Sequence, residues 1–514
     1  MKWRKGLRAA LGVVLCVGGF VLARATPYRE TTAIIGAGDC RLVTDVIDQG
    51  NDDARGFVVL FHGLAANKKI MSYLAHGYAD QNLRVFVPDL AGHGRTQGPF
   101  SFERAESCAE SMVRELIAHR AIEPQRAIIA GHSMGGAIAI RVAARVGVAG
   151  VVAISPAPMR AAHGVPGDAL PYTNPPPLPP HTLAISGAFE PFGIRETTRD
   201  LITGDAAATG KYLLVRGATH VSVLFDDRVV RAEQEWSAET LHFAAEPTAP
   251  SNAALTGSFA GLAGILLLAG PFLRETVGMQ TAATGSPQAA APVVEDASAT
   301  STRVPVFRAL LEVAGASFLA VVLLRFWNPL SFVRLFNGSY FASFGLIVGL
   351  ILLLIHRKLV RALWPTKISV LLRAALAGFL LHFLVTGWLD STLTESWLTW
   401  ARWARFPVLF VAALAYLVAE ELLLGPLSVR SSAARIWLAF ALRLTAFVAL
   451  VFGIFVLHSG AILVILLALY LALFFFFQRL GMDLVRRQTG SAIAAAVFGA
   501  ILLAGFCLVI FPIT

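Results

Sequence analysis

The second half of the chain has few ways to fold, because residues 251–514 consist mostly of long apolar runs. A helix of roughly twenty apolar residues crosses the hydrocarbon core of a bilayer. Inside lipid such a helix satisfies its own backbone hydrogen bonds, which an open strand or loop does not. We therefore expect an all-α transmembrane helix bundle of about eight helices. The expected spans are 253–273, 309–327, 339–356, 368–389, 406–425, 436–457, 460–477 and 491–512.

Composition agrees with a lipid bilayer as partner. The chain is 56% hydrophobic and 15% charged, with a net charge of +10, whereas soluble domains carry about 25% charged residues. The positive residues stand singly between apolar runs and form no basic stripe interleaved with aromatics, which argues against nucleic acid. One connection, 276–303, is rich in Ala, Ser, Thr and Pro and is expected to be flexible.

Residues 1–25 combine a basic start with an apolar core of about fifteen residues, the pattern of a signal peptide or signal anchor. Ala23-Arg24-Ala25 resembles a cleavage site, so a cleaved peptide and a retained anchor both fit. With a cytoplasmic N-terminus, the cytoplasmic segments hold sixteen Lys and Arg residues and the opposite loops four. The positive-inside rule then predicts a multi-pass cell-membrane protein whose residues 26–250 lie on the non-cytoplasmic side.

Residues 26–250 have a different pattern. Short apolar runs such as 56–63 and 126–131 alternate with helix-length segments such as 101–120 and 134–146. Continuous hydrophobicity in short strands indicates burial on both faces, as in a parallel sheet covered by helices. We therefore predict an α/β domain with a doubly wound, mostly parallel sheet.

A nucleophile motif follows one of these strands. Gly131, His132, Ser133, Met134 and Gly135 fit the pattern G-x-S-x-G between a strand and a helix. The serine of this pattern stands on a sharp, strained turn, and side chains two residues to either side would clash there. The spacing predicts Ser133 as a nucleophile at the positive end of the following helix.

Four segments carry a family resemblance. VVLFHGLAANK, VFVPDLAGHGRTQG, GHSMGGA and GATHVSVLF are similar to the motifs of α/β-hydrolases of the monoacylglycerol lipase and serine aminopeptidase branch. The resemblance spans residues 56–245 and none of 251–514. It implies an α/β-hydrolase fold and a serine nucleophile, and it leaves the substrate open.

The resemblance also implies roles for individual residues. The loop after the first strong strand, with Gly63, supplies one oxyanion-hole N–H at Leu64, and Met134 supplies the second. His220, just beyond the last strand, is the implied general base. The triad acid follows the preceding strand: Glu190 stands where the family usually has Asp, and Asp205 is the alternative. We favour Glu190, because Asp205 lies close to the start of the next strand and so at the opposite sheet edge.

Other polar residues are less informative. Cys40 and Cys108 are the two cysteines able to meet in a folded domain, and the sequence leaves their pairing open. Nothing in the sequence suggests a metal site or an organic cofactor. Glu420 and Glu421 resemble the paired glutamates of intramembrane prenyl-protein proteases without their accompanying motifs. We expect them at the interface or paired with Arg430 or Arg435, and we expect Arg373 and Arg443 to snorkel.

The sequence as a whole predicts a membrane-bound serine hydrolase. The expected substrate is a small-molecule or lipid ester, such as a monoacylglycerol or lysophospholipid, or else an amide, cleaved at the outer membrane face. Two alternatives remain open. The helical region is then a lipid or solute transporter with an accessory hydrolase domain, or an alcohol replaces water and the enzyme is an acyltransferase. No protein partner is indicated.

Overall fold

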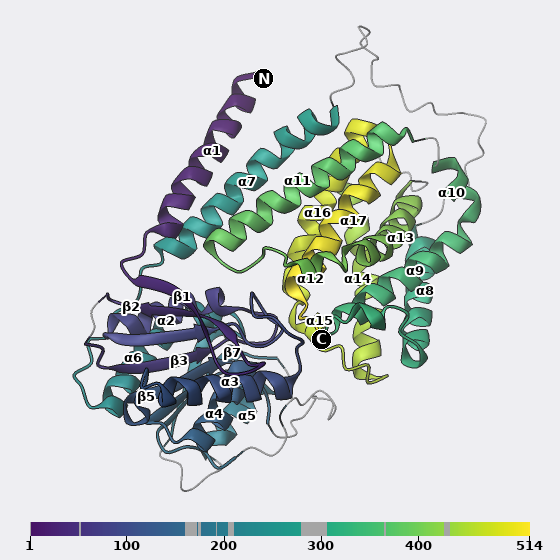
Figure 1. Ribbon diagram of the computed structural model, residues 1–514. Helices are drawn as coiled ribbons and strands as arrows, with labels where there is room; N and C mark the ends of the chain where they lie inside the picture. Colours follow the sequence, from purple (N-terminus) through teal and green to yellow (C-terminus); the bar gives the residue numbers. More distant parts are fainter. Residues whose placement is uncertain are drawn as a thin grey trace. The chain divides into compact units, whose positions relative to one another are not determined.

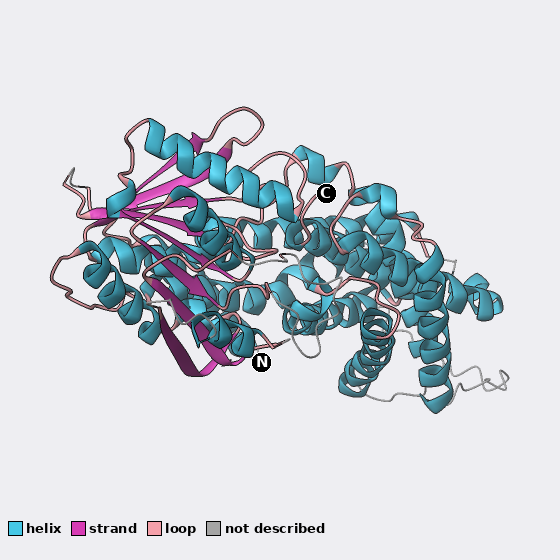
Figure 2. Cartoon of the chain, turned by 90° about the horizontal axis from the view of Figure 1, so that it is seen from below, coloured by secondary structure: helices cyan, strands magenta, loops and turns pink. Residues whose placement is uncertain are grey.

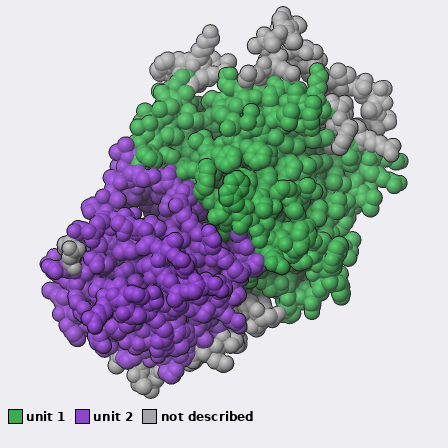
Figure 3. Space-filling view, in the orientation of Figure 1, with its two compact units in different colours: residues 1–20, 259–388, 397–511 green, residues 21–258, 389–396, 512–514 purple. Residues whose placement is uncertain are grey.

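The computed structural model describes residues 2–50, 53–159, 172, 176–191, 193–203, 210–278, 306–363, 366–425 and 432–514. They form two compact units, coloured separately in Figure 3. We call Met1–Phe20, Phe259–Trp388 and Trp397–Phe511 the helical unit. We call Val21–Ser258, Leu389–Ser396 and Pro512–Thr514 the sheet unit. The last two segments of the sheet unit come from the part of the sequence that is otherwise apolar helix.

The sheet unit is built on one eight-stranded sheet with the order β1-β2-β4-β3-β5-β6-β7-β8. The pairs β1–β2 and β2–β4 are antiparallel and all the others are parallel. The strands are β1 (Arg29–Ile35), β2 (Leu42–Asp48), β3 (Gly56–Phe61), β4 (Leu83–Pro88), β5 (Ala127–His132), β6 (Gly150–Ile154), β7 (Thr182–Phe189) and β8 (Lys211–Thr219). The chain turns back from β4 to β5 beside β3, so β3 and β5 flank the switch point where open α/β sheets place their sites. The mostly parallel sheet predicted from the sequence is confirmed.

Helices cover both faces of this sheet (Figure 2). They are α2 (Ser72–Asp80), α3 (Phe102–Ala118), α4 (Met134–Val146), α5 (Ile194–Thr203) and α6 (Asp227–Leu241). α2 contacts α6, and α3 contacts α4. All six residues of β5 are buried, as a central parallel strand requires. The core thus fixes β5, and with it the residue that follows β5.

Cys40 and Cys108 form a disulfide in the sheet unit, with their Cα atoms 4.8 Å apart. It joins the segment before β2 to α3 across 68 residues of sequence. The pairing that the sequence left open is therefore present in the structure.

The long helices of the chain are shown in Figure 1. They are α1 (Lys2–Arg24), α7 (Ala253–Gly278), α8 (Val306–Phe326), α9 (Gly338–Ile355), α11 (Ile368–Thr392), α13 (Phe406–Leu424), α14 (Ser432–Phe455), α16 (Ala468–Thr489) and α17 (Ala492–Ile510). Short helices α10 (Arg357–Leu363), α12 (Trp400–Trp403) and α15 (Leu463–Leu466) lie between them. Among the described residues, nine helices are long and apolar enough to cross a membrane. These helices are compatible with the membrane protein that the sequence predicts.

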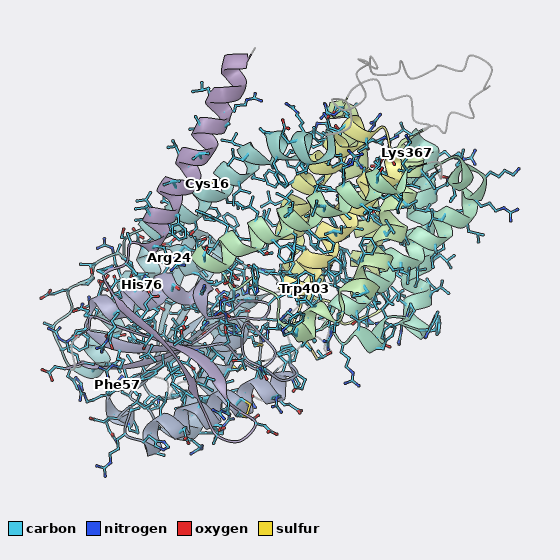
Figure 4. All side chains as sticks on the ribbon, turned by 45° about the horizontal axis from the view of Figure 1, so that its top comes forward. Cys16, Arg24, Phe57, His76, Lys367 and Trp403 are labelled. Atoms are coloured by element: carbon cyan, nitrogen blue, oxygen red, sulfur yellow. A yellow bond between two sulfur atoms is a disulfide. The ribbon has the colours of Figure 1, made fainter. Side chains whose placement is uncertain are left out.

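Small residues let the helices of the helical unit approach closely. A Cβ atom at Gly499 of α17 would lie 2.5 Å from the Met482 sulfur of α16. A Cβ atom at Gly264 of α7 would lie 2.6 Å from the Gly12 carbonyl oxygen of α1. Cys16, on the side of α1 that faces α7, donates to the Gly261 carbonyl at 3.6 Å (Figure 4). The N-terminal helix is therefore packed against α7.

One helix differs from its expected position. The sequence predicts a span at 460–477, whereas the structure has the short helix α15 and then α16 at Ala468–Thr489. Polar and charged residues follow Phe477 in the sequence. Gln478, Arg479 and Asp483 are nevertheless inside α16 and buried. Of the predicted loop 276–303, only residues 276–278 lie within the described residues, where they end α7.

The reason is a buried charge network between helices. Glu420 of α13 accepts from Arg443 Nε at 2.6 Å and from Arg479 NH1 at 3.1 Å. Glu421 accepts from Arg479 and from Arg486. Arg443 is 6% exposed, so the expectation that it snorkels is wrong. Of the two arginines expected to pair with the glutamates, Arg430 lies outside the described residues and Arg435 lies 3.7 Å from Asp483.

Candidate active site

Ser133 stands on a strained turn between β5 and α4. β5 ends at His132, α4 begins at Met134, and Ser133 between them has φ 55° and ψ −118°. A Cβ atom at Gly131 would lie 2.2 Å from the Gly135 carbonyl oxygen, and one at Gly135 would lie 2.3 Å from the Phe61 carbonyl oxygen. Both positions therefore require glycine, as the motif predicts.

The structure brings together three of the predicted site residues. His220, in the loop after β8, has Nε2 3.0 Å from Ser133 Oγ. Its Nδ1 lies 2.6 Å from Oε2 of Glu190, which follows β7. A neutral imidazole that donates from Nδ1 to the carboxylate accepts at Nε2 from the serine hydroxyl. The arrangement therefore has the geometry of a nucleophile, a base and an orienting acid.

Glu190 is held on both of its oxygens. Ser155 Oγ donates to Oε1 at 2.5 Å and the Gly187 N–H donates to the same oxygen at 2.9 Å. The Glu190 side chain is 0% exposed. Burial alone would raise the pKa of Glu190, but the hydrogen bonds from His220, Ser155 and Gly187 and the nearby imidazole outweigh it and lower this pKa. The carboxylate is thus fixed in place and ionised near neutral pH.

Sequence reasoning missed two residues that support this arrangement. His132 Nε2 lies 2.7 Å from the backbone carbonyl oxygen of His220. Burial, together with the neighbouring His220, lowers the pKa of His132 to about 3, so its ring is neutral and donates to that carbonyl. Ser155, directly after β6, is the hydroxyl that holds Glu190. The position directly before the serine in the G-x-S-x-G motif was the available signal for His132, and Ser155 had none beyond its place at a strand end.

The predicted oxyanion loop lies against the nucleophile. A Cβ atom at Gly63 would be 3.1 Å from Ser133 Cβ. His62 accepts from the Leu90 N–H at 2.9 Å and its Nδ1 lies 2.8 Å from the Gly63 carbonyl oxygen, so it shapes this loop. Met134 is the first residue of α4, and its amide has no carbonyl partner within the helix. The amides of Leu64 and Met134 therefore come from the two segments that border Ser133.

One prediction cannot be placed, because Asp205, the alternative acid, lies outside the described residues. No group of three or more His, Cys, Asp or Glu side chains that could hold a metal occurs in the described part of the chain.

The comparisons with known proteins agree with the fold. Residues 58–242 match the alpha/beta hydrolase family. A monoacylglycerol lipase of Mycolicibacterium smegmatis is 34% identical over 119 residues, which cover 23% of this chain and 42% of that protein. A pimeloyl-[acyl-carrier protein] methyl ester esterase of Nitrosospira multiformis is 31% identical over 110 residues, 21% of this chain and 38% of that protein.

A solved structure of a thermophilic esterase from Thermogutta terrifontis aligns with 41% of this chain and 99% of its own, at 17% identity and a TM-score of 0.32. The chain spans less than half the length of the curated relatives that it matches. The family match and the sheet together confirm the α/β-hydrolase fold predicted for the N-terminal part.

Proposed function

We propose that this chain, whose residues 58–242 form an α/β-hydrolase domain, is a membrane-bound serine hydrolase that cleaves an ester. The observation that carries the proposal is the hydrogen-bonded series from Ser133 through His220 to Glu190. It is built at the carboxyl ends of parallel strands, on a strained turn that exposes the hydroxyl. The esterase and lipase relatives support the same class of reaction.

The geometry provides each step of acyl transfer. Ser133 Oγ attacks the ester carbonyl carbon while His220 Nε2 accepts the hydroxyl proton. Glu190 keeps the ring oriented and stabilises the imidazolium that forms. The amides of Leu64 and Met134 donate to the oxyanion, and each such donor contributes about 10²–10³ in rate. His220 then protonates the leaving alcohol, and water releases the acyl group by the reverse sequence.

The substrate proposed here is a lipid ester with one acyl chain, of the monoacylglycerol or lysophospholipid kind. The apolar helices of the same chain support this choice, because they hold the enzyme at a bilayer. One relative is named for monoacylglycerol and the other for a methyl ester. Amide hydrolysis uses the same residues and is the alternative substrate class.

We place the sheet unit on the non-cytoplasmic side. With nine alternating spans, the segments after the first, the fifth and the ninth helix lie on one side, and these are the three segments of the sheet unit. The disulfide between Cys40 and Cys108 supports an oxidising compartment. The packing of α1 on α7 supports a retained anchor.

Labelling of isolated membranes with a fluorophosphonate tests the reaction. The full chain should be labelled and should release fatty acid from a monoacylglycerol presented in vesicles. The Ser133→Ala variant, at equal expression, should do neither. Labelling that persists in Ser133→Ala would remove Ser133 as the nucleophile, and transfer of the acyl group to an added alcohol in preference to water would make the enzyme an acyltransferase.

A membrane-impermeant maleimide tests the sidedness. In intact cells it should label a cysteine introduced at exposed Asp53 and leave one at exposed Lys358 unlabelled until the cells are permeabilised. The reverse pattern would place the sheet unit in the cytoplasm.

A further inference from the structure

Resting on the proposed function, we propose that Leu389–Ser396 is a positioning segment for the oxyanion loop, which we define as His62–Asn67. The segment follows the loop by more than three hundred residues of sequence, yet it belongs to the same compact unit. A piece of the apolar half of the chain thereby becomes part of the hydrolase machinery.

Asn67 connects the loop to the segment in both directions. Its Nδ2 donates to Thr394 Oγ1 at 2.7 Å, and its Oδ1 accepts from the Glu395 N–H at 3.2 Å. Asn67 is buried and lies three residues after Leu64, whose amide is the proposed oxyanion donor. A displacement of Asn67 is therefore transmitted to Leu64 through two residues of backbone.

The next residue adds a buried charge contact. The Lys68 ammonium is 3% exposed and donates to Oε1 of Glu395, whose side chain is itself 3% exposed. Asp89 Oδ2 at 3.4 Å and Asp45 Oδ2 at 3.6 Å surround the same ammonium. A buried ammonium requires such partners, so Glu395 helps to keep Lys68, and the loop before it, in place.

A neighbouring loop is held by the same segment. Arg95 NH2 donates to Asp390 Oδ2 at 3.0 Å, and Arg95 Nε lies 3.3 Å from Glu395 Oε1. Two residues earlier, His93 Nε2 accepts from the Ala65 N–H at 3.3 Å. Ala65, at the centre of the oxyanion loop, has φ 61°. This left-handed conformation is unfavourable for alanine and persists where surrounding contacts determine it.

Gly63, the residue before Leu64, has little room to move. The loop packs so closely that a Cβ atom at Gly63 would lie 3.0 Å from His132 Nδ1 and 3.1 Å from Ser133 Cβ. An oxyanion donor acts only when it points at the developing charge, and a misplacement on the order of 1 Å can cost about 10²-fold in rate. Loss of the Asn67 and Lys68 contacts should therefore lower kcat and leave KM nearly unchanged, because the donor acts in the transition state.

The experiment compares Thr394→Val, Thr394→Ser and Glu395→Ala in the full-length chain in detergent or nanodiscs. A soluble p-nitrophenyl ester gives kcat and KM, and hydrogen exchange gives the protection of the amides of residues 62–70. We expect Thr394→Val and Glu395→Ala to lower kcat by about tenfold with KM within twofold, since each removes the acceptor of one hydrogen bond from the positioned segment. Thr394→Ser keeps the hydroxyl and should recover most of the loss. Thr399→Val, exposed in the same connection and with no cap hydrogen bond, is the matched control and should match wild type.

The outcomes separate this inference from the proposed function. Wild-type kcat in both Thr394→Val and Glu395→Ala overturns the inference while Ser133 stays the nucleophile. The inference is also overturned if Thr394→Val lowers kcat, Thr394→Ser does not restore it, and the amide exchange of residues 62–70 is unchanged. If the wild-type chain hydrolyses no ester, the proposed function fails. Hydrogen exchange then still tests the positioning segment. Faster exchange of residues 62–70 in Thr394→Val, but not in Thr394→Ser, supports the contact, and equal exchange in all variants refutes it.

Discussion

Both units bury carboxylates, but they hold them in opposite ways. In the sheet unit Glu190 orients the partly exposed His220, and the neighbouring residues Ser133 and Ser155 have positive φ angles of 55° and 43°. In the helical unit Glu420 and Glu421 lie on one regular helix and are neutralised by arginines of two other helices. In the sheet unit the carboxylate holds an imidazole beside a serine on a strained turn. In the helical unit the carboxylates neutralise arginines inside an apolar bundle.

The difference supports the proposed place of the chemistry. A general base needs a lone pair that substrate or nucleophile can reach, and His220 Nε2 offers one to Ser133. The oxygens of Glu420 and Glu421 are already occupied by Arg443, Arg479 and Arg486. We infer that the glutamate pair is structural, because unpaired charge within lipid is costly and paired charge is tolerated. This contrast between the two units is wrong if substitutions of Glu420 and Glu421 lower turnover more than substitutions of the proposed triad.

The largest effect is expected at the nucleophile. Ser133→Ala should reduce turnover by at least about 10⁴-fold, because no other group replaces the attacking oxygen. Thermal unfolding of the purified variant, followed by tryptophan fluorescence, should match wild type. Turnover within tenfold of wild type would contradict the assignment.

The acid should show the next largest effect. Glu190→Gln should lower kcat by about 10²–10⁴, since an amide favours the wrong tautomer of His220. Glu190→Asp should retain part of the activity if the loop after β7 moves to recover the shorter reach. Asp205→Asn is the matched control and should change kcat less than about threefold. If Asp205→Asn is the more damaging change in equally folded protein, the triad acid is Asp205.

Substitution of the paired glutamates should lower the stability of the protein and leave the chemical step unchanged. Glu420→Gln leaves the Arg443 and Arg479 guanidinium groups under-neutralised, and breaking a buried pair costs about 3–5 kcal/mol. The thermal midpoint should therefore fall, while the fluorophosphonate labelling rate of the folded fraction stays within about twofold of wild type. A normal midpoint with lost labelling would place Glu420 in the reaction and end the contrast between the two units.

The disulfide should have a smaller effect. Joining residues 68 apart stabilises a domain by about 2–4 kcal/mol in most measured cases. Cys40→Ser with Cys108→Ser should lower the midpoint of the sheet unit and leave kcat unchanged, since neither residue touches the triad. Identical gel mobility with and without reductant, after free thiols are blocked, would show that the bond does not form in cells.

Local sequence patterns were enough to predict the fold and the three central residues of the site. The turn at Ser133 is specified by residues within five positions of one another, so the motif was enough to place it. Glu190 and His220 each follow a strand, and parallel strands bring their carboxyl ends to one edge. The sequence therefore predicted these three residues together, although their catalytic roles stay a proposal.

Contacts between distant parts of the sequence were not visible. Arg443 and Arg479 lie 23 and 59 positions from Glu420, and no periodicity links them. The segment 389–396 reads as an ordinary polar connection between two spans, so its place in the sheet unit was not expected. Charges after Phe477 suggested the end of a span, because their partners on other helices were unknown.

Glu395 and Glu190, two buried carboxyl groups of the sheet unit, should respond to pH in opposite ways. Burial, and then the neighbouring Asp89, raise the pKa of Glu395 to about 7 from 4.5, against the opposing effect of Lys68. Lys68, Asp89 and Arg95 face this carboxyl, and Asp45, whose pKa is also raised by burial, lies beyond Lys68.

A carboxyl whose folded pKa is raised contributes stability that is complete below its unfolded pKa and is lost as pH rises through the folded one. The pKa of Glu190 is lowered, so its contribution has the opposite sign and is lost only in more acidic solution. Between pH 5 and 8 the amide protection of residues 62–70 should therefore fall in wild type, after correction for intrinsic exchange, and should fall less in Glu395→Gln. Exchange is measured in place of turnover, because it reports on the oxyanion loop directly. An equal pH slope in both proteins would show that Glu395 does not titrate in this range, and that the contacts of the segment with the oxyanion loop are insensitive to pH.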